Sequence, residues 1–169
     1  MSDELVRKQF REAMAHLCAA VNIITTDGVH GRCGITASAV CSVSDDPPTM
    51  LVCINQSSAL HGVFAGNGRL CINVLPADHQ ELARHFAGMT KLPMDARFAQ
   101  HAWVEGELGM PRLTDALASL EGEIVDTKTM GSHSVMFIRV AHIALRGDGD
   151  GLTYFSRQFH RIPRSTPLA

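Results

Sequence analysis

Hydrophobic and polar residues follow two different periods along the chain. Between residues 5 and 18 the apolar positions recur every three or four residues, which places them on one face of an amphipathic helix. Shorter segments rich in Val, Ile, Thr and Cys follow, and they are separated by the turn-forming pairs Asp27-Gly28 and Pro47-Pro48. These segments predict consecutive strands over residues 21–26, 34–43 and 50–55.

The middle of the chain predicts two further helices with a strand between them. Residues 55–58 can cap a short helix over residues 59–64, which the glycines of the following Gly-Asn-Gly segment stop. Residues 69–75 predict a strand. Asp78 can then cap a helix that runs through Phe86 and ends at Gly88.

Long alternating runs dominate the last third of the chain. Residues 118–128 and 134–145 predict paired strands, and a glycine-rich turn at residues 147–151 leads into a final strand over residues 152–155. Many strands joined by short turns predict a mainly β fold, a barrel or sandwich with a few covering α-helices. We expect one domain over residues 1–162, followed by a loose C-terminal tail over residues 163–169.

Composition narrows the class of protein. A chain of 169 residues with 46% hydrophobic and 19% charged residues matches a globular domain with its own core. The net charge is −2 and the basic residues are scattered, so no stripe of cations is available for nucleic acid. No run approaches the ~18 apolar residues that span a bilayer, and the N-terminus lacks a secretory pattern. We therefore expect a cytoplasmic protein with no nucleic-acid or membrane partner.

Five cysteines suggest reduced core thiols. All but Cys33 lie inside apolar runs, as buried thiols do. No Cys-x-x-Cys pair is present, and no cysteine has a histidine at metal-ligand spacing. We expect neither a disulfide framework nor a metal site.

Four segments are candidates for ligand chemistry. The small residues and hydroxyls of residues 34–43 would let a flat ligand approach the backbone, although a strand packed closely on a helix has the same composition. Ser57 and Ser58 at a helix start could bind an anion or simply cap the helix. His133 at a turn could face a cleft or solvent, and Arg157 could hold a pyrophosphate or project from an edge strand.

Several catalytic motifs are absent from the sequence. It contains no Gly-x-Gly-x-x-Gly segment, no Gly-x-x-x-x-Gly-Lys-Ser/Thr loop and no Gly-x-Ser-x-Gly elbow. These absences argue against a Rossmann dehydrogenase, a P-loop NTPase and a serine hydrolase of the elbow type. A reaction that needs no protein nucleophile is favoured.

Taken together, motifs from about residue 10 to residue 162 resemble one family, the flavin reductase components of two-component aromatic monooxygenases, and within it the reductases of 4-hydroxyphenylacetate 3-monooxygenase. Matching segments are Phe10-Arg11-Glu12-Ala13-Met14, residues 20–26, 34–43, 51–55, 70–75 and 83–90, Arg97-Phe98, residues 119–124, Gly131-Ser132-His133 and Tyr154-Phe155. Their occurrence in order is more specific than any one motif.

The resemblance implies a split β-barrel of the FMN-binding type, normally a homodimer with the flavin near the subunit interface. Carried over by position, the implied flavin-binding residues are Thr36, Ala37, Ser38, Ala39, Ser42, Val43, Cys53, Asn55, Ser57, Ser58, Phe86, Ala87 and Gly88. The implied residues for the nicotinamide dinucleotide are His133, Tyr154 and Arg157.

The implied activity is an NADH-dependent flavin reductase. Hydride would pass directly from NADH, or NADPH, to FMN or FAD, so no catalytic side chain is expected. The reduced flavin would leave for a separate flavin-dependent monooxygenase, whose substrate by analogy is a phenolic acid of the 4-hydroxyphenylacetate type. Two alternatives stay open: a flavoprotein of the same barrel that keeps its flavin bound as an oxidase or electron carrier, and a non-catalytic module that binds flavin or haem.

Overall fold

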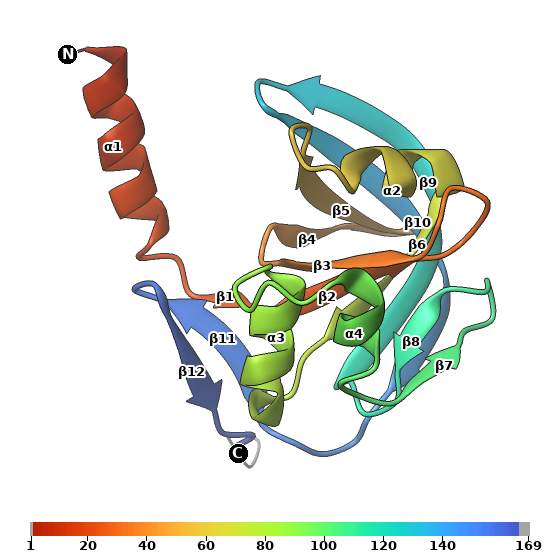
Figure 1. Cartoon of the computed structure of the whole chain (residues 1–169). Coiled ribbons are helices and arrows are strands. Elements are labelled where there is room, and N and C mark those ends of the chain that lie inside the picture. Colours follow the sequence, from red (N-terminus) through yellow and green to blue (C-terminus); the bar gives the residue numbers. More distant parts are fainter. Residues whose placement is uncertain (1, 166–169) are drawn as a thin grey trace.

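The computed structural model describes residues 2–165, and its centre is one curled antiparallel sheet (Figure 1). Seven strands pair in the order β3-β2-β6-β9-β10-β5-β4. Their bounds are β2 (Asn22–Thr26), β3 (Cys33–Ala37), β4 (Val40–Asp45), β5 (Pro48–Asn55), β6 (Arg69–Val74), β9 (Ala118–Met130) and β10 (His133–Leu145).

The two edges of this sheet are consecutive in the chain. β3 ends at Ala37 and β4 begins at Val40, yet the two strands lie at opposite ends of the strand order. The sheet therefore curls until its edges approach, and the amide of Cys53 donates to the carbonyl of Ala39 at 3.0 Å beside this junction. The predicted split β-barrel with a few covering helices is confirmed. The single strand predicted over residues 34–43 is wrong, because the chain crosses the split at Ser38.

Two smaller sheets complete the β structure of the described residues. β1 (Ala19–Ala20), β11 (Gly151–Phe155) and β12 (Gln158–Ile162) form one, and β7 (Trp103–Glu105) and β8 (Pro111–Leu113) form the other. The prediction that residues 152–155 form the last strand is wrong, since β12 pairs with β11 from Gln158 to Ile162. Its alternate polar residues are exposed on a hairpin and carry no apolar run that would have indicated a strand.

Residues 2–165 form four α-helices and one 3-10 helix beside these sheets. They are α1 (Asp3–Met14), α2 (His61–Asn67), η1 (Ala77–His79), α3 (Gln80–Phe86) and α4 (Met94–Phe98). α3 and α4 lie side by side in front of the barrel, whereas α1 extends away from it as an arm (Figure 1). The amphipathic N-terminal helix is confirmed, but it ends at Met14 and not at residue 18, and none of its residues is buried in this chain.

The predicted N-caps of the later helices are wrong. Asp78 lies within η1, and its carboxylate accepts from Arg161 instead of capping α3. α2 begins at His61 without a side-chain cap, two residues after the predicted start, because the preceding serines bond locally. The helix runs to Asn67, three residues beyond the predicted end at Phe64, and it is Gly68 that stops it, in the left-handed conformation, with φ 68°, that favours glycine after a helix.

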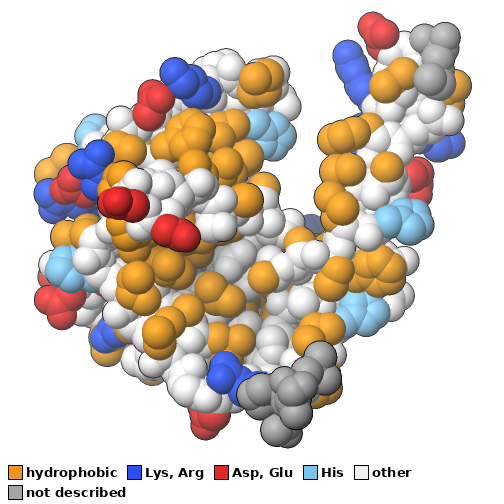
Figure 2. Space-filling model, turned by 180° about the vertical axis from the view of Figure 1, so that it is seen from behind, with side chains coloured by type: hydrophobic (Ala, Val, Ile, Leu, Met, Phe, Trp, Pro, Cys, Tyr) orange, Lys and Arg blue, Asp and Glu red, His pale blue; other side chains and the backbone are white. Residues whose placement is uncertain are grey.

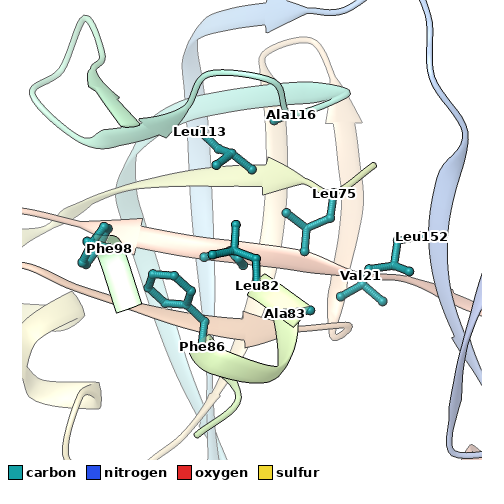
Figure 3. Packing of buried hydrophobic residues seen from close by; sticks show 10 residues of the cluster. Val21, Leu75, Leu82, Ala83, Phe86, Phe98, Leu113, Ala116 and Leu152 are labelled. Carbon is teal, nitrogen blue, oxygen red and sulfur yellow. The ribbon is translucent and has the colours of Figure 1, made fainter. Parts of the chain in front are cut away.

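Hydrophobic side chains form two clusters on the two faces of the sheet. Ile24 on β2 points into the barrel interior, where α2 inserts Phe64. The neighbouring Ile23 belongs to the cluster on the other face. There α3, α4 and the segment after β8 cover the sheet with Leu82, Phe98 and Ala116 (Figure 3). Successive strand residues face opposite sides, so β2 is buried on both and helps to fix α3 against the barrel.

The cysteines are all free, but their burial differs from the prediction. Cys33 is buried on β3, although no apolar run surrounds it, and Cys71 is buried as expected. Cys18 and Cys41 are exposed. A strand residue can be buried by its position in the sheet alone, because neighbours on adjacent strands are invisible in a local window of sequence.

The chain end is only partly covered by the structure. Of the predicted loose tail, residues 166–169 lie outside the described residues. In the described part, Arg164 donates to the carbonyl oxygens of Gly147 and Gly149. Among residues 2–165, no helix combines the length and apolar character needed to cross a membrane.

Candidate functional site

A cavity of about 300 Å³ opens where the barrel is split. It lies between the end of β3, the end of β5 and the C-terminal end of α3. Its lining residues are Ile35, Thr36, Ala37, Ser38, Ala39, Cys53, Ile54, Asn55, Ser58, Phe86 and Ala87. The structure thus brings together nine of the predicted flavin residues, from three separate segments of the chain.

The crossing between β3 and β4 forms one wall of the cavity. The amide of Val40 donates to the carbonyl of Ser38 at 2.9 Å, which turns the chain tightly at this point. Small side chains at Ala37, Ser38 and Ala39 leave the main chain accessible from the cavity side. A planar ring can approach such a wall closely, because no bulky side chain stands in its way.

The turn after β5 forms the polar end of the cavity. Asn55 Oδ1 accepts from both the amide and the hydroxyl of Ser57, each at 2.9 Å. Ser58 Oγ accepts from the amide of Leu60 at 3.3 Å, and Ser58 itself lines the cavity. The two serines therefore differ: Ser57 is hydrogen-bonded to Asn55 within the turn, whereas Ser58 lines the cavity.

The end of α3 forms the opposite wall. Thr36 Oγ1 donates to the carbonyl of Ala83 at 2.7 Å, which fixes α3 on β3. Phe86 packs edge-to-face on Phe98 and Trp103, with ring centroids 5.0 and 5.5 Å apart. This aromatic support holds the wall residues Phe86 and Ala87 in place.

A second cavity, of about 180 Å³, adjoins the first and shares the wall residues Thr36, Ser38 and Ala87 with it. Tyr154 and Phe159 from the β11–β12 hairpin form its far side. A third, of about 280 Å³, continues past Tyr154 to Arg157. Each cavity shares lining residues with the next, so the three form a row from the split of the barrel to the hairpin, called the flavin path below.

Sequence reasoning missed several residues of this path. Met89 and Phe159 line the second and third cavities, and Gln80, Arg84 and Gln158 line the third. Met89 stands within the matched segment over residues 83–90, so its neighbours could have indicated it. Phe159 could not be found in this way, because β12 was itself not predicted.

Arg157 is held by the N-terminal arm. The hairpin turns at Ser156 and Arg157, whose φ angles are 50° and 60°. Arg157 donates to Glu12 at 2.9 Å, and this hydrogen bond, together with the positive charge, lowers the pKa of Glu12. The guanidinium keeps further donors for an anionic ligand, since arginine carries five N–H groups.

His133 lies apart from the other two predicted nicotinamide residues. It begins β10 and pairs with Asn55 on β5, so it stands beside the polar end of the first cavity. Its Nδ1 is 2.9 Å from the hydroxyl of Ser132. His133 lines none of the three cavities, whereas Tyr154 and Arg157 lie at the far end of the path.

Four predicted flavin residues also lie outside the lining of the first cavity. They are Ser42 and Val43 on β4, Ser57 in the turn after β5, and Gly88 after α3. Gly88 has φ 76° and ends the helix, so it sets the direction of the chain beyond the wall residue Ala87.

A larger hollow, of about 700 Å³, lies elsewhere, between the β2–β3 turn and the β7–β8 hairpin. Charged side chains such as Asp27, Arg32, Arg69 and Glu105 line it. None of the predicted site residues belongs to it. The smaller cavity at the split is the better candidate, because its walls of small uncharged residues match a planar ligand. Volume alone does not identify a binding site.

The path offers binding groups and little catalytic chemistry. Its first cavity presents hydroxyls, an amide side chain, one half-buried thiol and main-chain groups. A planar heterocycle with carbonyl and N–H groups can bond such a set without a charged partner. The arrangement suits a reaction in which bound cofactors supply the reactive atoms.

Comparison with known proteins agrees with this geometry. A "4-hydroxyphenylacetate 3-monooxygenase reductase component" from Pseudomonas aeruginosa is 56% identical over 156 residues, covering 92% of either chain. An "FMN reductase (NADH)" from Variovorax paradoxus is 49% identical, covering 94% of this chain and 87% of the relative.

Solved structures give the same result. An NADH:FAD oxidoreductase from Streptomyces globisporus, determined in complex with NAD and FAD fragments, superposes with a TM-score of 0.87 at 26% identity, covering 99% of both chains. Residues 14–163 match the family described as "flavin reductase like domain". The chain therefore belongs to the flavin reductase like family, as the sequence motifs predicted.

Proposed function

We propose that this protein is an NADH-dependent flavin reductase that binds FMN or FAD in the cavity at the barrel split and releases it reduced. One observation carries the proposal: nine predicted flavin residues line a single cavity, and neighbouring cavities lead from it toward Tyr154 and Arg157. When bound, the nicotinamide supplies a hydride and the flavin accepts it. The protein positions the two rings and excludes water between them.

The proposed roles follow from the position of each residue. Thr36, Ala37, Ser38 and Ala39 would lie along the flavin ring, with Phe86 and Ala87 on the opposite wall. Cys53, Asn55 and Ser58 would face its ribityl or phosphate part. Ser42, Val43, Ser57 and Gly88 would complete the site from outside this cavity.

Tyr154 and Arg157 would receive the dinucleotide at the far end of the path. His133 would approach the nicotinamide and flavin rings from the opposite side, next to Asn55 on β5. Relatives named as NADH-dependent FMN reductase and NADH:FAD oxidoreductase support flavin and NADH as the cofactors. NADPH would be the weaker donor.

The reduced flavin would pass to a separate monooxygenase. Relatives that are named as the reductase component of such a system support this partner, with a phenolic acid of the 4-hydroxyphenylacetate type as the oxygenase substrate. The walls of the cavity are uncharged, which suits a flavin that must leave after each turnover.

Steady-state oxidation of NADH with added FMN or FAD tests the proposal. We expect the rate to rise with free flavin and to saturate, because flavin is then a substrate. A rate that ignores free flavin, in protein that retains its own, would indicate a tightly bound flavoprotein. Failure to oxidise NADH with either flavin would leave a non-catalytic binding module and defeat the proposal.

We further propose a homodimer in which a second copy covers the arm α1. Figure 2 shows hydrophobic side chains gathered on the arm, on the side that faces a hollow beside the body. Phe10 is 61% and Val6 is 46% exposed, although both belong to the apolar stripe of the helix. The amide of Ser156 donates to Ala15 at 2.7 Å and so fixes the base of the arm to the hairpin. Exposed apolar stripes of this kind mark protein interfaces.

Sedimentation over a range of concentrations tests the dimer. Phe10→Glu should shift the equilibrium toward monomer at least tenfold, whereas Lys8→Glu on the polar side of α1 should not. A monomeric wild-type protein would contradict the proposal. We also propose a cytoplasmic location, since the five free cysteines suit a reducing compartment.

A further inference from the structure

Two histidines and an aspartate converge at a point that the flavin path does not use. His79 Nε2 is 2.8 Å from Asp115 Oδ1, His101 Nε2 is 3.3 Å from the same oxygen, and the two Nε2 atoms are 2.9 Å apart. The imidazole planes are nearly perpendicular, at 82°. Each residue thus directs one potential ligand atom to a common point.

The three residues come from three separate segments. His79 ends η1 and precedes α3, His101 follows α4, and Asp115 follows β8. Their separations in sequence match no short metal motif, which is why cysteine and histidine spacing predicted no metal site. Only the packing of α3, α4 and β8 on the barrel brings them together.

While Asp115 is ionised, no placement of the ring protons satisfies all three contacts. The amide of Ala102 donates to His101 Nδ1 at 2.8 Å, so the neutral ring carries its proton on Nε2, the atom that faces His79 and Asp115. If His79 Nε2 also carries a proton, two N–H groups oppose each other. If it carries none, its lone pair opposes the carboxylate. One of the three contacts is then repulsive in either state.

We propose that His79, His101 and Asp115 form a binding site for a divalent transition-metal ion of the Zn²⁺ class. A cation turns all three contacts into attractive ones, because each atom offers a lone pair to it. Zn²⁺ binds imidazole nitrogen and carboxylate oxygen at about 2.0–2.2 Å, which requires neighbouring ligand atoms roughly 3.3 Å apart in a tetrahedral site. The observed separations of 2.8–3.3 Å need only a small expansion.

Metal binding has one local cost. With the ion on Nε2, the ring proton of His101 moves to Nδ1, and the adjacent amide of Ala102 must give up its hydrogen bond.

A contact outside the three ligands supports the site. Arg146 donates to the main-chain carbonyl of Asp115 at 3.1 Å and so fixes the segment that carries Asp115. In metal sites, hydrogen bonds from outside typically hold the ligand residues in place.

The ion would act as a clamp and not as a catalyst. None of the three ligands lines the cavities of the flavin path. The side chains are 12%, 28% and 39% exposed, so an ion can enter from solvent and keep a water as fourth ligand. It would tie the start of α3 to β8 and to the end of α4, while the other end of α3 carries Phe86 to the cavity.

Zinc titration of chelator-treated protein tests the site by calorimetry. We expect one Zn²⁺ per chain in the wild type, with affinity reduced at least tenfold in Asp115→Asn and in His101→Gln. His142→Gln, which removes an exposed histidine on β10, is the matched control and should bind as the wild type does. Saturating zinc should raise the melting temperature of the wild type and the control, but not of the two site variants.

A second measurement needs no substitution. The ring ¹⁵N resonances of His79 and His101 should change on zinc addition to the wild type, with the His101 proton moving to Nδ1. A wild type that binds no zinc, or equal binding in all four proteins with no change at these two rings, would overturn the proposal and leave a hydrogen-bonded cluster. Neither readout uses flavin or NADH, so the outcome is separate from that of the reductase assay.

Discussion

The hydroxyl of Thr36 on β3 donates to the carbonyl oxygen of Ala83 on α3 at 2.7 Å. The same carbonyl accepts the amide of Ala87 at 3.0 Å, so one oxygen joins the strand wall of the cavity to the helix wall. The hydroxyl proton of Thr36, which the family resemblance assigns to flavin binding, is therefore committed to holding the two walls together. Its lone pairs remain available to a ligand.

Thr36→Val should weaken both the fold and flavin binding. Valine keeps the branched shape but loses the donor, which we expect to lower the free energy of unfolding by about 1 kcal/mol. The KM for flavin should rise, because α3 is no longer fixed on β3. Urea unfolding and steady-state kinetics measure the two effects. Thr36→Ser retains the donor and should lie near the wild type; equal behaviour of valine and serine variants would contradict the role of the bond.

Gly34→Ala should disturb the same wall from within. A Cβ at Gly34 would lie 2.7 Å from Cε1 of Phe86, which is buried among aromatic rings and has little room to move. Overpacking of this kind costs about 1–3 kcal/mol, and the shifted Phe86 should raise the KM for flavin.

Gly62→Ala is the matched control for this substitution. Gly62 lies on α2, and a Cβ there meets no atom within 4 Å. Its stability should be unchanged or higher by up to about 1 kcal/mol, since alanine favours helix. If thermal unfolding showed equal losses for both variants, the contact with Phe86 would not be the cause.

His133→Ala tests the side from which the nicotinamide enters. If His133 contributes to that site, its removal should raise the KM for NADH more than the KM for flavin. Arg157→Gln at the opposite end of the path offers a comparison in the same assay. A larger change in the KM for flavin would assign His133 to the flavin side, next to Asn55.

The fold was largely predictable where the pattern is local. Alternation over residues 118–128 and 134–145 identified β9 and β10, and the resemblance supplied the split barrel. The break at Ser38 was not predictable from composition, because small β-forming residues continue on both sides of it. Only the meeting of the two sheet edges, a long-range event, forces the chain to cross there.

The residues of the site also divide into those that local sequence patterns predict and those that only long-range packing brings together. Thr36, Cys53, Asn55 and Phe86 belong to conspicuous motifs, and the structure gathers them at one cavity. Phe159 and the cluster around Asp115 depend on tertiary packing between segments far apart in sequence. No local window contains that information, so sequence reasoning could not find them.

The cysteines should separate into reactive and protected thiols. Burial, with a smaller effect from the charge of Asp27, raises the pKa of Cys33 to about 12, and burial also raises that of Cys71. In native protein at pH 8, a thiol reagent should modify the exposed Cys18 and Cys41 and leave these two untouched. Peptide mass mapping before and after unfolding measures this.

The same shifts give a pH dependence of stability. Cys33 and Cys71 keep their protons in the folded state, whereas an unfolded thiol loses its proton above pH ~8.5. The unfolded state then binds fewer protons, so their contribution to stability is present below that pH and falls as the pH rises further. Urea unfolding at pH 8 and pH 10 should show this loss; Cys33→Ala should reduce it, and an undiminished loss in that variant would contradict the assignment.

Asn73→Asp should be among the most damaging changes outside the site. Asn73 is fully buried on β6; its Nδ2 donates to the carbonyl of Ile23 at 3.1 Å and to Thr25 Oγ1 at 3.3 Å. Its Oδ1 accepts from the amide of Leu113 at 2.9 Å and from Ser119 Oγ at 3.1 Å.

Aspartate at position 73 has nearly the same shape as asparagine, but when ionised it cannot make the two donations, and it places a charge in the core. We expect a loss of about 3 kcal/mol or more by urea unfolding at pH 7. Ser119→Ala removes one bond and should cost about 1 kcal/mol; an equal cost for the two variants would mean that Asn73 does not join these strands.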